Sequence, residues 1–162
     1  MTIRCTHRVG LLLTGLLLVT LALPFITYAP NRLLSGEGRG LWQVMPWLAG
    51  VQLAAALAGI LLCWLPGRVA PLLHLLLAEL LFPLLIWGSG QAALELSRHG
   101  SPLARTSPGS GLWLSLALCL LLASEAIRHL TARPLWRWLL NAQVWLLPII
   151  LLAAGALDQL SL

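Results

Sequence analysis

The sequence predicts an all-α integral membrane protein of about five transmembrane helices, and three observations support this fold class. Hydrophobic residues make up 59% of the chain and charged residues only 9%, whereas about a quarter of the residues of a soluble domain carry charge. The mean hydropathy is +0.90. Long apolar runs alternate with short connectors that hold nearly all the charges. We therefore expect one membrane domain over residues 1–162.

Five apolar segments approach the length that a transmembrane helix needs, which is about 20 residues for a hydrocarbon core of about 30 Å. The first segment follows two arginines, Arg4 and Arg8, as the apolar core of a signal peptide follows basic residues. Its apolar run is longer than a signal core of about 7–15 residues and no small-x-small cleavage site follows, so we interpret it as a retained helix. The predicted spans are 9–27, 44–65, 70–90, 112–127 and 138–157.

The basic residues of the connectors indicate an orientation. All of them are arginines, and the net charge is +5. Because they lie singly at the ends of apolar runs, they indicate topology and lipid contact rather than a nucleic-acid surface. A cytoplasmic N-terminus places most of them inside, which predicts an N-in, C-out chain. The inner set is Arg4, Arg8, Arg68, Arg128, Arg133 and Arg137, and the outer set is Arg32, Arg39, Arg98 and Arg105.

Tryptophans mark the same boundaries, as the aromatic belts of membrane proteins do. We expect Trp47 and Trp145 to lie deeper, as packing residues. The expected interface residues are Trp42, Trp87 and Trp113 on the outer side and Trp64, Trp136 and Trp138 on the inner side.

The two outer connectors, 28–43 and 97–112, resemble each other because both bring glycines and a Gly-Leu-Trp into the next helix. Two explanations account for this similarity. The helix pair is duplicated, or the two connectors acquired independently the residues that suit the start of a helix. The glycines of SGEGRG lack the strand or the Gly-Lys-Ser/Thr that a nucleotide loop requires. The charged side chains remain candidate outer-loop contacts: Arg32, Glu37, Arg39 and Arg105.

Glu79 is the most unusual residue, because it lies in the middle of the third apolar run. A carboxylate at bilayer depth costs about 2.5 kcal/mol or more by insertion scales, and such residues mark pathways or partners. Two interpretations stay open, a hydrogen-bonded side chain that holds helices together and a transport role. His74 lies five residues away, about 140° around a helix, and shares no face with Glu79.

The sequence shows no catalytic or metal-binding constellation, so we expect no enzyme activity, no cofactor and no metal. The histidines and cysteines lack metal-ligand spacing, and Cys63 and Cys119 fall in apolar runs as buried thiols do. Two acid–arginine pairs at i,i+3 spacing predict anchors at helix ends, Glu95 with Arg98 and Glu125 with Arg128.

Four phrases give the chain a family resemblance: LPFITYAPNRLLSGEGRGLWQ at 23–43, SPLARTSPGSGLWL at 101–114, PLWRWLLNAQ at 134–143 and LDQLSL at 157–162. They resemble the N-terminal membrane region of the permease subunit of Yeh-type osmoprotectant (glycine betaine/choline) ABC importers. The resemblance implies a multi-pass protein of the bacterial inner membrane that contacts lipid. It also implies three protein partners: a permease core, an ATPase subunit and a soluble binding protein.

One departure qualifies the resemblance. Permeases of this family carry a cytoplasmic coupling loop in their core, and no such stretch occurs in residues 1–162. We therefore expect an accessory region, truncated or split from its core, that cannot couple ATP hydrolysis to import alone. The alternatives are a free-standing small membrane protein with a structural or interaction role, and an autonomous small transporter that uses Glu79.

Overall fold

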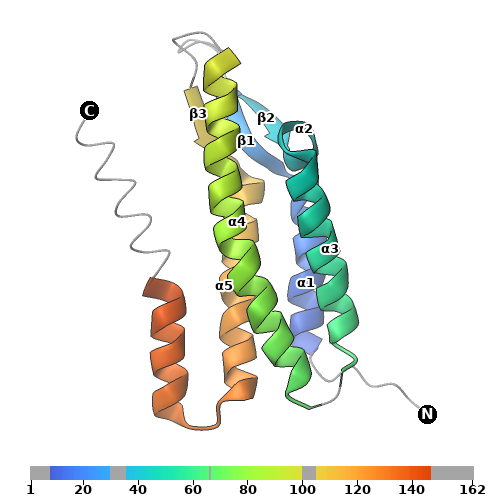
Figure 1. Cartoon of the computed structure of the whole chain (residues 1–162), viewed down its shortest axis with the longest axis vertical. Coiled ribbons are helices and arrows are strands. Elements are labelled where there is room, and N and C mark those ends of the chain that lie inside the picture. The colour runs from blue at the N-terminus through green and yellow to red at the C-terminus, as the bar shows by residue number, and fades with distance from the viewer. Residues whose placement is uncertain (1–7, 30–35, 66, 100–104, 147–162) are drawn as a thin grey trace.

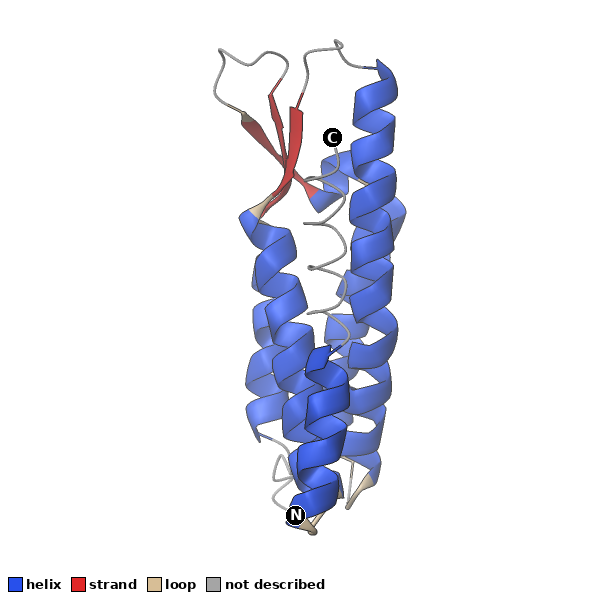
Figure 2. Ribbon diagram, turned by 90° about the vertical axis from the view of Figure 1, so that its left-hand side faces the viewer, coloured by secondary structure: helices blue, strands red, loops and turns tan. Residues whose placement is uncertain are grey.

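The computed structural model describes residues 8–29, 36–65, 67–99 and 105–146, which form an elongated helical bundle with a small sheet at one end (Figures 1 and 2). The helices are α1 (Arg8–Thr20), α2 (Leu41–Val44), α3 (Pro46–Leu62), α4 (Val69–His99) and α5 (Ser110–Leu130). The strands are β1 (Pro24–Ala29), β2 (Glu37–Gly40) and β3 (Arg105–Pro108). A further helix begins at residue 134 and is described to residue 146.

The three-stranded sheet corrects the all-α prediction. β1 lies in the centre and pairs antiparallel with β2 on one side and with β3 on the other. β1 has the sequence PFITYA, whose aromatic and β-branched residues favour a strand. Because these residues are also apolar, the prediction had joined 24–27 to the first membrane helix.

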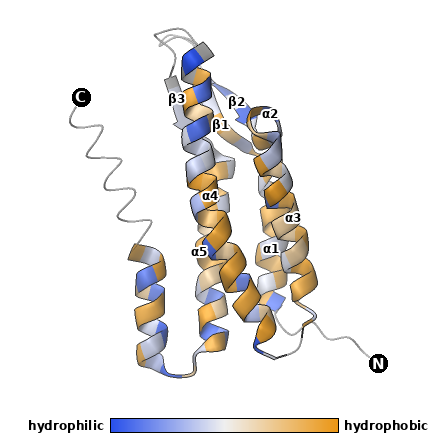
Figure 3. Ribbon diagram, in the orientation of Figure 1, coloured by the Kyte–Doolittle hydropathy of each residue, from blue (hydrophilic) through white to orange (hydrophobic). Residues whose placement is uncertain are grey.

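Successive long helices run antiparallel, and helix 134–146 runs back along α5 towards the sheet end (Figure 1). α4 and α5 share the most extensive helix contact, while α1 packs against both α3 and α5. The buried core runs between these helices and includes Leu17, Leu48, Leu85 and Leu122, each of which is fully buried. The middle of the bundle is strongly apolar, and polar residues gather at the upper end of α4 beside the sheet (Figure 3).

Two described helices are long and apolar enough to cross a membrane, Val69–Leu96 within α4 and Ser110–Leu130, which is α5. They contain the predicted spans 70–90 and 112–127. The helices at the first two predicted spans are shorter, with 13 residues in α1 and 17 in α3. At about 1.5 Å per residue these helices extend about 20 and 26 Å. The five-span prediction therefore lacks support. Part of the fifth span, 138–157, lies outside the described residues.

The two similar connectors form the two outer strands of the same sheet. Each strand leads through a glycine in extended backbone conformation, Gly40 or Gly109, into a helix. The first turn of each helix then buries a leucine, Leu41 or Leu112, and exposes the tryptophan that follows it. The shared Gly-Leu-Trp thus has one structural role, which is to turn a chain from the sheet into the bundle.

The tryptophans lie largely exposed along the bundle, including Trp145, which we expected to be a packing residue and which is 42% exposed. Trp87 and Trp113 are 52% and 47% exposed. Trp47, which we expected to lie deeper, is 48% exposed, and its ring packs against Trp87 with the centroids 5.8 Å apart. Trp47 therefore lies at the same level of the bundle as Trp87.

Candidate functional site

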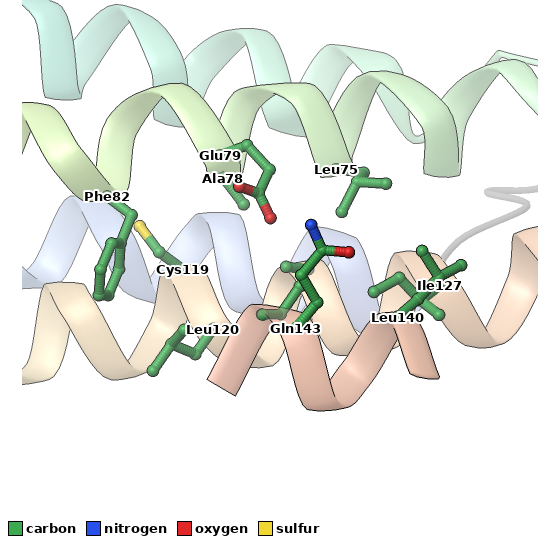
Figure 4. Close-up of a pocket in the computed structure, with 11 residues that line it drawn as sticks. Leu75, Ala78, Glu79, Phe82, Cys119, Leu120, Ile127, Leu140 and Gln143 are labelled. Atoms are coloured by element: carbon green, nitrogen blue, oxygen red, sulfur yellow. The ribbon is translucent and has the colours of Figure 1, made fainter. Parts of the chain in front are cut away.

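Glu79 projects from the first half of α4 into a groove between α4, α5 and helix 134–146 (Figure 4). The cavity in this groove has a volume of about 270 Å³. Its walls include the buried side chains of Phe82, Cys119 and Ile127. Because Glu79 itself is exposed, the groove opens onto the lateral surface of the bundle.

The amide of Gln143, on helix 134–146, faces the Glu79 carboxylate across the groove (Figure 4). Three hydrogen bonds hold this helix to α5 and to Thr131, the residue that follows α5. The Trp145 Nε1–H donates to Ser124 Oγ over 3.1 Å, and the Arg137 guanidinium donates to the Thr131 carbonyl oxygen over 2.9 and 3.3 Å. Gln143 lies in the sequence between Arg137 and Trp145, so these contacts hold it opposite Glu79.

The remaining wall of the groove is apolar. Apart from Glu79 and Gln143 it is formed by leucine, alanine, phenylalanine, cysteine, isoleucine and valine side chains. Among the described residues that line the groove, none carries a positive charge. In general, a carboxylate within a membrane-spanning segment is stabilised by a proton, by hydrogen-bond donors or by a cation that it pairs with. The groove thus combines one acid and one amide, which is too few oxygen ligands for a calcium site, since Ca²⁺ takes about 6–8.

His74 and Glu79 face different neighbours, as their spacing predicts. The His74 side chain is buried and its Nε2 lies 2.8 Å from the carbonyl oxygen of Gly59 in α3. The Cys63 thiol donates to the same oxygen over 3.3 Å. His74 therefore joins α4 to α3, whereas the groove that Glu79 lines lies between α4 and α5.

The outer-loop candidates gather on the sheet. Glu37 and Arg39 both lie exposed on β2, and the Arg39 guanidinium stacks over the Tyr28 ring at 5.2 Å from its centroid. No ion pair joins Glu37 to Arg39 in the described chain. Arg105 begins β3, on the other side of β1, where its Cα pairs with Ala29. Arg32 lies outside the described residues.

The acid–arginine pairs predicted for the helix ends are present. Glu125 and Arg128 approach to 3.1 Å in the last turns of α5, and His129 adds a second contact to Glu125 at 3.2 Å. Glu95 and Arg98 form a looser, exposed pair at 3.8 Å near the end of α4. Such exposed pairs contribute about 1 kcal/mol or less, so they anchor helix ends rather than form a site.

A buried polar cluster of Thr20, Gln52 and Ser115 was missed by the sequence analysis. Gln52 Nε2 donates to Thr20 Oγ1 over 2.7 Å and approaches Ser115 Oγ at 3.2 Å. The Ser115 hydroxyl donates to Thr20 Oγ1 over 2.8 Å. The cluster joins α1, α3 and α5 just below the sheet. Its one visible mark in the sequence is Gln52, a lone amide inside the apolar run of α3.

No group of three or more potential metal ligands occurs within the described residues. The described cysteines, Cys63 and Cys119, are both buried. The chemistry of the described chain is therefore that of helix packing, one polar groove and an exposed charged sheet.

Comparison with known proteins identifies the family. A family model described as the N-terminal domain of the ABC transporter permease YehY matches residues 7–162. No curated protein and no solved structure matches the chain. A permease domain is a membrane component of a transport system, and hydrolysis of ATP belongs to its ATPase partner. Since the match covers nearly the whole sequence, the chain belongs to the family of the ABC transporter permease YehY N-terminal domain.

Proposed function

We propose that this chain is the N-terminal accessory transmembrane region of an ABC importer for osmoprotectants such as glycine betaine. The family match over residues 7–162 carries the proposal. In this role the helices pack in lipid beside a permease core, which either follows on the same polypeptide or is a separate subunit. The ATPase and a soluble binding protein complete the assembly.

The proposed orientation is N-in, so that the sheet stands on the outer side of the bacterial inner membrane. The distribution of arginines supports it, because positive charge favours the cytoplasmic side. In the described chain the sheet end of the bundle carries fewer arginines than the opposite end. Those at the sheet end are Arg39, Arg98 and Arg105, and those at the opposite end are Arg8, Arg68, Arg128, Arg133 and Arg137. On this view the charged residues of the sheet contact the binding protein, and they are proposed together with Arg32 as outer-loop contacts.

The orientation is tested by labelling single cysteines with a membrane-impermeant maleimide in a Cys5→Ser background, since Cys63 and Cys119 are buried. Glu37 on β2 and Ala132 after α5 are both exposed. We expect Glu37→Cys to be labelled in intact spheroplasts and Ala132→Cys to be labelled only after the membrane is permeabilised. The reverse pattern would establish an inverted topology.

The function is tested by deleting the codons for residues 7–162 from the chromosomal gene. Uptake of radiolabelled glycine betaine is then measured at high osmolarity. We expect uptake through this system to fall at least tenfold and to return when the intact region is supplied. The chain, purified from native membranes in mild detergent, should carry the permease core and the ATPase with it. Unchanged uptake together with isolation of the chain alone would favour a free-standing small membrane protein. Uptake by the purified chain in vesicles would instead establish an autonomous transporter.

A further inference from the structure

The groove at Glu79 presents an acid without a counter-charge. The carboxylate faces the Gln143 amide across a cavity of about 270 Å³ whose other lining residues are apolar, and Glu79 is exposed on the lateral surface. A lipid acyl chain in this groove would leave the carboxylate with the Gln143 amide as its one polar neighbour among the described lining residues. Acids within membrane segments pair with other polar or charged groups, and a cationic donor is the occupant that would also neutralise the charge of Glu79.

The described part of this chain does not supply that cation. Its arginines lie at helix ends or on the sheet. The nearest one on the helix that carries Gln143 is Arg137, six residues away, or about 9 Å along the helix axis. Arg137 already donates to the Thr131 carbonyl oxygen. A second copy of the described chain would bring the same distribution of charge, and it therefore offers no basic residue at the depth of Glu79.

The size of the cavity limits the occupant further. Small-molecule pockets usually enclose about 300–1,000 Å³, so 270 Å³ lies just below that range. The space suits a single long side chain that enters from a neighbouring helix as a knob enters a hole. The aliphatic stem of an arginine or lysine covers apolar surface well while its head reaches a polar group.

We propose that this groove is the docking slot for one basic side chain from a transmembrane helix of the permease core. The stem lies against Leu75 and Leu140, and the charged head donates to the Glu79 carboxylate and to the side-chain oxygen of Gln143. This inference rests on the proposed function and adds to it the face by which the accessory bundle meets its core. The opposite side of the bundle, where Leu12 of α1 is 62% exposed, faces lipid.

The docking face, which is the side of the bundle that carries the Glu79 groove, is tested by photo-cross-linking in native membranes. The chain is expressed from its own locus. A diazirine amino acid replaces Leu140, which lines the groove, or Leu12 as the control. We expect adducts from Leu140 that map by mass spectrometry to a core helix, with at least a tenfold lower yield from Leu12. Core adducts from Leu12 alone would overturn the docking face and leave the proposed function standing. Adducts from Leu140 only to a second copy or to lipid would overturn the docking slot. Absence of transport-protein adducts at both positions would overturn the docking slot and the proposed function together.

The requirement for the negative charge of Glu79 is tested by substituting this residue in the strain that carries the diazirine amino acid at Leu140. We expect E79D to keep at least half of the adduct yield, and E79Q and E79L to lose at least fivefold. Leucine suits a membrane helix, so membrane levels of E79L, checked by immunoblot, should remain normal. A yield from E79Q equal to that of the parent would overturn the requirement for a charge pair.

Discussion

Replacing Gly109 with alanine is expected to lower the free energy of unfolding by about 2–3 kcal/mol, the upper part of the range for overpacked sites. The Gly109 N–H donates to the Phe25 carbonyl oxygen over 2.8 Å, which holds the glycine against the Pro24–Phe25 peptide. An added Cβ would overlap the Pro24 carbonyl oxygen and lie 2.7 Å from the Pro24 carbonyl carbon. Backbone atoms of the central strand cannot move aside as a side-chain tip does. In detergent, the midpoint of thermal unfolding should fall by about 5–10 °C.

The matched control is Gly40, the glycine that precedes the helix in the other connector. Its backbone is also extended, with φ −70° and ψ 159°, and a Cβ there would meet nothing within 4 Å. Gly40→Ala should therefore change stability by less than about 0.5 kcal/mol. Equal effects at both glycines would contradict the close approach of Gly109 to β1.

The second large effect is expected for Thr20→Val, which keeps the shape of the side chain and removes its hydroxyl. Thr20 Oγ1 accepts hydrogen bonds from Gln52 Nε2 and from Ser115 Oγ. Without this acceptor, Gln52 Nε2 loses its shortest hydrogen bond and keeps the longer ones to Leu17 O and Ser115 Oγ. The Ser115 hydroxyl keeps the Gly111 carbonyl oxygen at 2.8 Å, so the expected cost is that of the lost contacts between helices, about 1–2 kcal/mol. The unfolding midpoint should fall by about 3–6 °C.

Thr14 on the same helix provides the control. It is buried like Thr20, but its hydroxyl donates only to carbonyl oxygens of its own helix, Gly10 at 2.7 Å and Leu11 at 3.2 Å. Thr14→Val should cost less than about 0.5 kcal/mol, because no bond between helices is lost. If both variants were destabilised equally, the polar cluster would not be the source of the effect.

The sequence predicted the features that depend on composition and on neighbours in the chain. The apolar runs of α4 and α5 stand out by length, and the Glu125–Arg128 pair follows from helical spacing. The sheet was missed because PFITYA has no charged residue and continues the apolar run of the helix before it. Hydrophobic periodicity does not separate a short buried strand from a helix. β3 also joins β1 only after three intervening helices, α2, α3 and α4, so its pairing depends on tertiary structure.

The candidate site was predicted in part, for a similar reason. Glu79 is conspicuous as an acid inside an apolar run, whereas Gln143 has no local feature that sets it apart. Their meeting requires helix 134–146 to fold back along α5. The Thr20–Gln52–Ser115 cluster is likewise non-local, because its members lie 32, 63 and 95 residues apart. Sequence reasoning finds an unusual residue more easily than the partner that tertiary folding brings to it.

The sheet determines which movements the bundle can make. β1 continues from α1, β2 leads through α2 into α3, and β3 leads into α5. Backbone hydrogen bonds between the strands thus fasten one end of each of these three helices to a common support. Sliding one of them along its axis would break the strand register, whereas small tilts about the fastened end would preserve it. A load applied to the sheet would therefore reach the far ends of α1, α3 and α5 as a pivoting motion, with the largest displacement at the membrane face opposite the sheet.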